Sequence, residues 1–148
     1  MKRYTQILYQ LVFSTKNREM TLLKDNRPIL YNYIWGILKD KNCFLHRIGG
    51  IEDYTHIVFS LHPSIALADL VKDIKLATSD FIKRNNLFPT FAGWQKGYGA
   101  FTYTIEAKEA LVAYVKNQEE HHKTVSSKEE IMDLLQDFGI EFEESDLD

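Results

Sequence analysis

The chain has 148 residues, of which 45% are hydrophobic and 13% aromatic, which is enough to bury the core of one domain and too little for two. No apolar run approaches the length of a membrane span, and the N-terminus lacks a signal-peptide block, so we expect a cytoplasmic protein. The single cysteine, Cys43, excludes an intramolecular disulfide; between apolar neighbours it is interpreted as a buried residue rather than a thiol nucleophile.

The charge is unevenly distributed along the chain. The net charge is −3, but residues 129–148 hold nine acidic residues and no Lys or Arg, which leaves residues 1–128 with 12 acidic against 18 basic residues and a net charge of +6. Such a basic body is compatible with a nucleic-acid partner. We expect residues 1–128 to form a single domain and residues 129–148 to be an acidic tail that is part of the same domain. The tail is either solvated and partly helical, or docked on the basic body or on a partner.

The first half of the chain predicts a strand, a helix and a hairpin. Residues 4–13 alternate in the pattern of a strand covered on both faces. Apolar residues at helical spacing predict a helix over residues 24–41, with Pro28 in the first turn, where proline is tolerated. A strand from Cys43 and a second one from Tyr54 to Leu61 predict a β-hairpin with its loop near residues 49–53, where Gly49-Gly50 is a turn signal.

The second half predicts a further helix, strand and helix. After Pro63, apolar residues from Leu67 to Ile82 mark an amphipathic helix, residues 85–98 are loop-like, and Phe101 and Tyr103 indicate a fourth strand. A helix over residues 109–118 follows. The order β-α-β-β-α-β-α predicts an α+β fold, a ferredoxin-like sandwich in which a four-stranded antiparallel sheet carries helices on one face, with a C-terminal helix in addition.

Two groups of polar residues carry the chemistry. Tyr114 and Gln118 are four residues apart on the last helix, so their side chains project from one face; a phenol can act as a nucleophile, and a carboxamide oxygen can bind a hard cation. In the strand from Tyr54, the side chains of Tyr54 and His56 share one face. Together these groups suggest metal-assisted phosphate chemistry, although a helix tyrosine is most often a packing residue.

The motifs around these residues extend over nearly the whole chain. They are Tyr9-Gln10-Leu11-Val12-Phe13-Ser14-Thr15-Lys16, Gly49 to Leu61, Leu67 to Lys75, Gly97-Tyr98-Gly99-Ala100-Phe101, and Tyr114 to His122. In this order they resemble the single-tyrosine transposases of the insertion-sequence and repetitive-palindrome-associated kind, whose mark is His-hydrophobic-His (HUH) after an Asp. The resemblance implies DNA transposition by a homodimer that cuts and rejoins hairpin-bearing single-stranded DNA with Mg²⁺ or Mn²⁺.

Carried over by position, the resemblance makes Tyr114 the catalytic nucleophile, which attacks a backbone phosphorus to form a 5′-phosphotyrosine link and release a 3′-hydroxyl. His56 and Gln118 would hold the metal, which would stabilise charge on phosphorus. The first histidine of the motif is Tyr54 here, and a phenol is a poor replacement for imidazole. His46, if it lies opposite His56 in the hairpin, or Asp53 is then the candidate for a further ligand, although Asp53 also suits turn capping.

The resemblance and the basic body together direct attention to DNA contacts. His121 and His122 follow the Tyr114 helix and are interpreted as phosphate or water contacts or as surface residues. Lys72, Lys75, Lys83 and Arg84 form the most basic helix face, either as phosphate contacts or as solvated charges. The leading hypothesis is a DNA strand transferase. The alternatives are a degenerate family member that only binds DNA, which Tyr54 favours, and a regulatory dimer with no DNA partner, which the basic body disfavours.

Overall fold

The computed structural model describes residues 1–148 and contains a four-stranded antiparallel sheet in the order β2-β3-β1-β4. The strands are β1 (Leu8–Ser14), β2 (Phe44–Ile51), β3 (Tyr54–Ser60) and β4 (Gly99–Tyr103). The central strand β1 pairs with β3 on one side and with β4 on the other, so β2 and β4 are the edge strands. This arrangement confirms the predicted α+β class and the antiparallel sheet.

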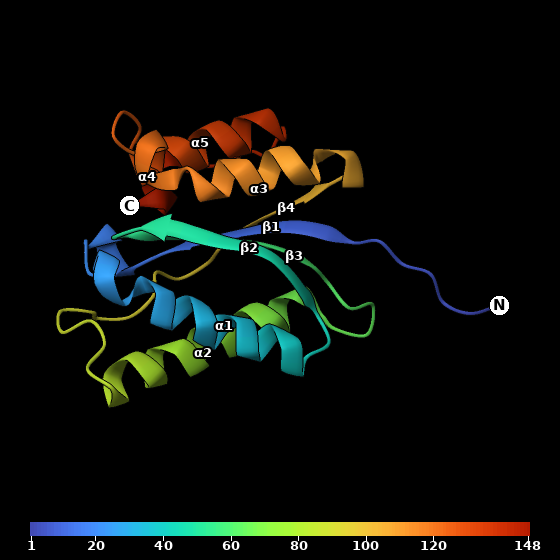
Figure 1. Cartoon of the computed structure of the whole chain (residues 1–148). Helices are drawn as coiled ribbons and strands as arrows, with labels where there is room; N and C mark the ends of the chain where they lie inside the picture. Colours follow the sequence, from blue (N-terminus) through green and yellow to red (C-terminus); the bar gives the residue numbers. More distant parts are fainter.

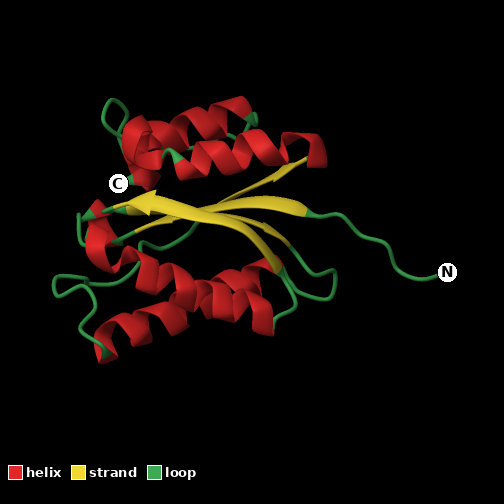
Figure 2. Ribbon diagram, in the orientation of Figure 1, coloured by secondary structure: helices red, strands yellow, loops and turns green.

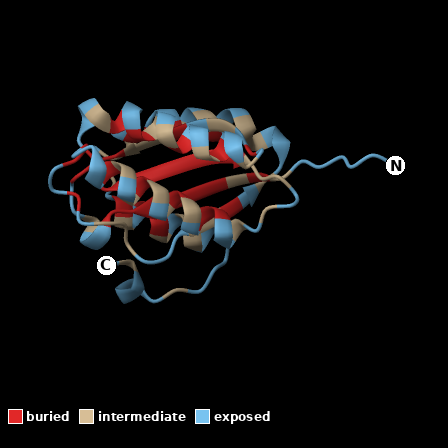
Figure 3. Ribbon diagram, turned by 90° about the horizontal axis from the view of Figure 1, so that it is seen from below, coloured by how far each residue is buried: buried red, intermediate tan, exposed pale blue.

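Two long helices cover one face of the sheet. They are α1 (Arg27–Asp40), with Pro28 in its first turn, and α2 (Leu67–Arg84). Leu30, Ile34 and Leu38 of α1 recur every four residues and are fully buried, which directs one stripe of the helix at the sheet. Seen from below (Figure 3), exposed residues lie on the outer sides of these two helices, and the sheet behind them is buried. The main hydrophobic core therefore lies in this layer.

The opposite face of the sheet is covered by the C-terminal third of the chain (Figures 1 and 2). Its helices are α3 (Lys108–Lys116), the short α4 (Gln118–His121) and α5 (Ser127–Asp137). Leu111 and Val115 of α3 pack on Leu8 and Val58 of the sheet. Ile131 of α5 packs in a second small cluster on this face. The sheet is thus enclosed between two helical layers, and the tyrosine helix lies on the face away from α1 and α2.

Gly49 and Gly50 lie within β2 and not in the hairpin loop, which corrects the predicted turn. The turn consists of Glu52 and Asp53, and Ile51 pairs with Tyr54. A Cβ atom on Gly49 would clash with the backbone oxygen of Val115 in α3. The glycine is therefore required by the close approach of the tyrosine helix to the sheet, and not by a turn.

Two predicted element boundaries also change. The first strand begins at Leu8 and not at Tyr4, because Leu8 is already opposite the last residues of its neighbours, Ser60 and Tyr103, and the preceding residues have no strand to pair with. The predicted helix over residues 109–118 is divided at Asn117, which has non-helical backbone angles (φ −94°, ψ 19°). Tyr114 and Gln118 consequently belong to two successive helices.

The acidic C-terminal segment lies against the body of the protein. Arg18 donates to the backbone oxygen of Leu147 over 2.7 Å, and Lys128 forms ion pairs with Glu144 and Asp148. Gln95 donates to the backbone oxygen of Asp148 over 2.7 Å. Two carboxylates of the segment therefore lie beside Lys128, and its last two residues are hydrogen-bonded to the body through their backbone oxygens.

Candidate metal centre and nucleophile

Polar side chains from four elements meet on the sheet face that α3, α4 and α5 cover. His56 projects from β3, Tyr114 from α3 and Gln118 from α4, while Glu130 comes from the first turns of α5. The side chain of His56 is fully buried, and the residues Gln118 and Glu130 are 1% and 2% exposed. A buried polar cluster of this kind costs folding free energy unless its members satisfy one another or hold a ligand.

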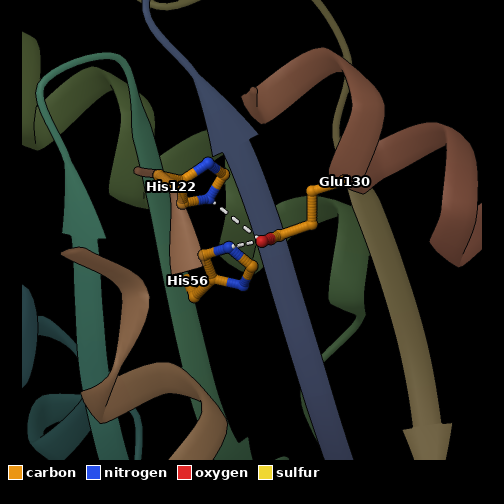
Figure 4. Close-up of side chains that lie close together, drawn as sticks. All are labelled: His56, His122 and Glu130. Carbon is orange, nitrogen blue, oxygen red and sulfur yellow. Dashed lines mark ion pairs between the residues drawn. The ribbon is translucent and has the colours of Figure 1, made fainter. Parts of the chain in front are cut away.

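The carboxylate of Glu130 lies at the centre of the cluster. Its oxygens are 2.5 Å from Nε2 of His56, 2.9 Å from Nε2 of His121 and 3.0 Å from Nε2 of His122. Figure 4 shows the side chains of His56, from β3, and His122, which follows α4, both directed at Glu130. One ligand atom from each of His56, His122 and Glu130 lies within 4.8 Å of the others, so these three residues form a possible metal-binding triad.

The hydrogen bonds of the imidazole rings determine which nitrogen faces the centre. Nδ1 of His122 is 2.6 Å from the backbone oxygen of Val125, and a carbonyl only accepts, so Nδ1 carries a proton. Nε2 of His122 is then directed at two acceptors, Oε1 of Gln118 at 2.8 Å and a Glu130 oxygen. Nε2 is satisfied in one of two ways. Either the ring is an imidazolium that donates from Nε2, or a cation is bound by His122, Gln118 and Glu130 together.

The buried atoms at the centre fit a divalent cation. Nε2 of His56 and both oxygens of Glu130 are buried without an assigned hydrogen bond, and their nearest polar neighbours are one another and the imidazoles of His121 and His122. Imidazole nitrogen, carboxylate oxygen and carboxamide oxygen are donors suited to Mn²⁺ and, for the oxygens, to Mg²⁺. His56, His122, Glu130 and Gln118 therefore offer a plausible ligand set.

Burial and charge shift the ionisation of this cluster. Burial lowers the pKa of His56, and the Glu130 carboxylate opposes that effect only in part. For His122 burial also acts to lower the pKa, but Glu130 outweighs it and raises the pKa overall. Burial acts to raise the pKa of Glu130, yet His122 and His56 beside it hold that pKa well below its usual range. The carboxyl is therefore ionised and able to attract a cation.

Tyr114 lies beside the cluster and is half-buried. Its oxygen is 3.5 Å from Nε2 of His121, and its ring centroid is 6.0 Å from that of His56. Burial, followed by the charge of Glu130, raises the pKa of Tyr114, so the resting phenol is protonated. A cavity of about 420 Å³ between α3 and α5 exposes Tyr114, and its lining includes Asp133, Asp137 and Glu130. This acidic lining would repel a phosphodiester unless a cation were bound.

Tyr54 occupies the position of the first motif histidine but takes a packing role. Its side chain is buried at 2% exposure in a cluster with Val12, Ile51, Phe101 and Ile131. Its ring packs edge-on against His56 with 4.7 Å between centroids. Burial raises the pKa of the phenol well above its ordinary value. It shares the face of His56, as predicted, but is not among the residues that converge on Glu130.

The two other ligand candidates lie apart from the cluster. Gly49, and not His46, is opposite His56, because the turn lies at Glu52 and Asp53 and Ile51 pairs with Tyr54; a register shift between Leu45 and Arg47 also leaves His46 unpaired. Nε2 of His46 is 2.8 Å from Oγ of Ser60. Asp53, in the β2–β3 turn, accepts a 2.6 Å hydrogen bond from the hydroxyl of Ser127 and so ties the turn to the start of α5. The structure thus brings His56 and Gln118 together, but not His46 or Asp53.

The basic residues of α2 lie on the far side of the sheet from Tyr114 (Figure 1). Nζ of Lys75 donates to the backbone oxygens of Gln95 and Gly97, and Arg84 pairs with Asp80 over 2.7 Å. Lys72 and Lys83 are exposed. These cations are therefore not positioned to contact the phosphate that Tyr114 would attack.

A groove with more basic than acidic residues lies closer to the cluster, along the free edge of β2. It encloses about 990 Å³, and its lining includes the cations Lys24, Arg27, Lys39, Arg47 and Lys116, the acids Glu119 and Glu120, and the aromatic residues Trp35 and Phe44. Lys24 and the buried Arg27 pair with Glu119, which leaves Lys39, Arg47 and Lys116 as the cations without an ion pair. Gln118 also lines this groove, which connects it to the ligand cluster. Aromatic and basic side chains in one groove are typical of single-strand binding surfaces.

The sequence did not indicate that His122 and Glu130 join this cluster. The signal for Glu130 was local: Ser126 and Glu129 form a capping box that starts α5 and places Glu130 in its first turn. The direction of α5 over the sheet is a tertiary property that this signal does not contain. Both residues also lie beyond residue 118, where the family match described next ends.

Comparisons with known proteins identify the family and the fold. No curated protein matches the chain. Among solved structures, a candidate transposase from Deinococcus radiodurans R1 is similar with a TM-score of 0.60 and 23% identity, over 80% of this chain and 98% of the other. A REP-associated tyrosine transposase, solved with a REP hairpin bound, has a TM-score of 0.62 and 14% identity, over 82% of this chain and 72% of the other. These likenesses show the shared fold. Residues 3–118 match the family described as Transposase IS200 like, and because this is most of the chain, the protein belongs to the IS200-like transposase family.

Proposed function

We propose that this transposase-family protein binds hairpin-bearing single-stranded DNA as a homodimer in the cytoplasm and cleaves and rejoins it through a 5′-phosphotyrosine intermediate. The observation that carries the proposal is the convergence of Tyr114 with His56, Gln118, His122 and Glu130 in one buried cluster. Mg²⁺ or Mn²⁺ is the proposed cofactor. When bound, it would supply Lewis-acid stabilisation of the charge that develops on the phosphate oxygens.

The residues of the chain divide the remaining tasks. The oxygen of Tyr114 attacks phosphorus and forms the new O–P bond, while the bond to the 3′ oxygen breaks and that oxygen leaves as a 3′-hydroxyl after taking a proton. We propose that the pair of His121 and Glu130 takes the phenol proton, because Nε2 of His121 is 3.5 Å from the Tyr114 oxygen and 2.9 Å from a Glu130 oxygen. Because burial raises the pKa of Tyr114, such an acceptor is needed for attack at neutral pH.

The DNA partner is supported by charge and by family. The groove beside β2 offers exposed cations, among them Lys39 and Lys116, with Trp35 for stacking, and it reaches Gln118 at the cluster. We propose that the scissile strand follows this groove. The cations of α2, among them Lys72 and Lys83, lie on the opposite face of the sheet. They remain proposed contacts for duplex DNA or for a part of the single strand that is distant from the scissile phosphate.

A binding-only role is the second candidate. This role is favoured by Tyr54, which occupies the position of the first motif histidine. Its phenol packs in an apolar cluster, so the site has no imidazole from this position. In that case the DNA-binding groove operates without the chemistry of Tyr114. The two candidates differ in one product, a covalent protein–DNA adduct.

The test is incubation with Mn²⁺ and a labelled hairpin-bearing single strand from the DNA that flanks the gene, followed by denaturing gel analysis. Wild type, Tyr114→Phe and Tyr54→His are compared, with Tyr98→Phe as the matched control because Tyr98 is an exposed tyrosine outside the cluster. We expect an adduct with wild type and Tyr98→Phe and none with Tyr114→Phe. If the wild type binds the DNA without forming an adduct, and Tyr54→His does form one, the binding-only role is established.

A further inference from the structure

A second layer of hydrogen bonds lies behind His56. Nδ1 of His56 is 2.9 Å from Oε1 of Gln10, and Nε2 of Gln10 donates to the hydroxyl of Tyr103 over 2.8 Å. Gln10 is fully buried on the central strand β1, between Val58 of β3 and Phe101 of β4. The three side chains form one chain, from the partly exposed Tyr103 to the ligand cluster.

The orientation of the Gln10 amide determines the proton position on His56. Because the amide nitrogen of Gln10 faces Tyr103, its carbonyl oxygen faces His56, and a carbonyl oxygen can only accept a hydrogen bond. Nδ1 of His56 therefore carries the proton. The lone pair of the neutral ring is then on Nε2, the nitrogen that lies 2.5 Å from Glu130 and has no hydrogen-bond partner.

We propose that Gln10, whose amide nitrogen donates to the Tyr103 hydroxyl, is a positioning residue that holds His56 in the Nδ1–H tautomer and so presents Nε2 as a metal ligand. This inference rests on the proposed metal-dependent function and adds two residues to it. Ligating histidines commonly donate their second N–H to an acceptor that fixes ring and tautomer, and loss of that acceptor typically lowers metal affinity about 10–100-fold.

The opposite orientation of the amide would have the opposite effect. With the Gln10 nitrogen facing His56, Nδ1 would accept and Nε2 would carry the proton, donating toward Glu130. The imidazole would then be satisfied within the protein and would have no lone pair for a cation. The tautomer of His56 is thus a direct readout of the role of Gln10, and it does not require catalysis or bound metal.

The first measurement is the tautomer of His56 in metal-free protein, from long-range ¹H–¹⁵N correlation spectra at neutral pH. We expect the Nδ1–H tautomer in wild type. In Gln10→Leu, which keeps the approximate size of the side chain and removes the acceptor, we expect loss of that tautomer preference. Gln10→Glu is the conservative rescue, because a carboxylate also accepts from Nδ1. A merely structural Gln10 would leave the tautomer of His56 unchanged in all three proteins.

The second measurement is Mn²⁺ affinity of the same proteins by electron paramagnetic resonance. We expect Gln10→Leu to bind Mn²⁺ about 10–100-fold more weakly than wild type and Gln10→Glu to bind within about threefold of it. Tyr103→Phe removes only the hydroxyl that accepts the hydrogen bond from the Gln10 amide nitrogen, and we expect it to weaken binding by a smaller factor because the amide is then less firmly held. It also keeps the test valid if Gln10→Leu does not fold, since Tyr103 is only partly buried.

The outcomes separate this inference from the proposed function. The inference is overturned if wild-type His56 is the Nε2–H tautomer, or if Gln10→Leu and Tyr103→Phe both leave the tautomer and the Mn²⁺ affinity unchanged. If wild-type His56 is the Nδ1–H tautomer and Gln10→Leu changes it, but wild type binds no Mn²⁺, then Gln10 positions His56 as inferred and the proposed metal centre is wrong.

Discussion

At the scale of single residues, Glu130 determines the character of the cluster. It brings an ionised carboxylate into contact with three imidazoles, of which His56 and His122 are buried and His121 is partly exposed. Such a group is stabilising only while its partners balance it, because an unpaired buried charge costs several kcal/mol. The same carboxylate would compensate for the imidazole that Tyr54 does not supply.

The pKa shifts at Glu130 and His122 predict the pH range in which their contact stabilises the metal-free protein. The pKa of Glu130 is lowered by folding, so its contribution is present above about pH 4.5 and is lost as pH falls. The pKa of His122 is raised, so its contribution is present below about pH 6.5 and is lost as pH rises through the raised value. The pair is therefore most stabilising between about pH 4.5 and 6.5.

We expect Glu130→Gln to reduce the melting temperature most within this range and less on the acid side of it, where the wild-type carboxyl takes up a proton on unfolding. Thermal unfolding of metal-free wild type and Glu130→Gln from pH 3 to 8 checks this. Glu129→Gln is not a suitable control because Glu129 closes the capping box, whereas Glu109→Gln changes an exposed carboxyl of α3. A constant difference in melting temperature across the range would contradict the assignment.

At the scale of elements, the close packing of α3 on β2 positions Tyr114 relative to His56. The backbone of Val115 lies so near Gly49 that a side chain there would displace the helix. The break at Asn117 then lets α4 turn Gln118 inward, and the capping box at Ser126 starts α5 with Glu130 facing the same point. Three helix boundaries thus converge on one site.

We expect Gly49→Ala to destabilise the protein by about 1–3 kcal/mol, because overpacking between α3 and β2 forces the helix outward. The matched control is Gly36→Ala in α1, where a Cβ atom meets nothing within 4 Å and helix propensity predicts a gain of about 0.5–1 kcal/mol. Urea unfolding measures both. Equal effects of the two substitutions would show that the approach of Val115 is not limiting.

At the scale of the whole molecule, the acidic C-terminal segment occupies two cations of the body. Leu147 and Asp148 engage Arg18 and Lys128, and removal of residues 141–148 takes away five acidic residues and no basic one, which changes the net charge from −3 to +2. Phe138, which packs on Phe101 and Tyr103, would be retained. No helix of the structure is long and apolar enough to cross a bilayer.

We expect the protein without residues 141–148 to bind single-stranded DNA more tightly, with a steeper salt dependence. If Arg18 and Lys128 each gain a phosphate contact, the slope of log K against log salt should increase by about 1.4. Titrations of a labelled strand at several salt concentrations measure this slope. A full-length variant with the same five acids changed to amides separates charge from bulk. An unchanged slope in both proteins would show that the segment does not compete with DNA.

Much of the molecule was determined by the sequence itself. Hydrophobic periodicity placed α1, α2 and the strands, because one buried stripe or face per element is a local pattern, and motif order identified the family through His56, Tyr114 and Gln118. The roles of those three residues at the site stay predictions. Only the tertiary structure decided which residues surround His56. The strand register keeps His46 away, Tyr54 packs in an apolar cluster, and His122 and Glu130 reach His56 from the chain beyond the tyrosine helix. These contacts depend on how α5 crosses the sheet and on the close approach of α3 that Gly49 allows. Such long-range packing leaves no period or spacing in the sequence from which it could be predicted.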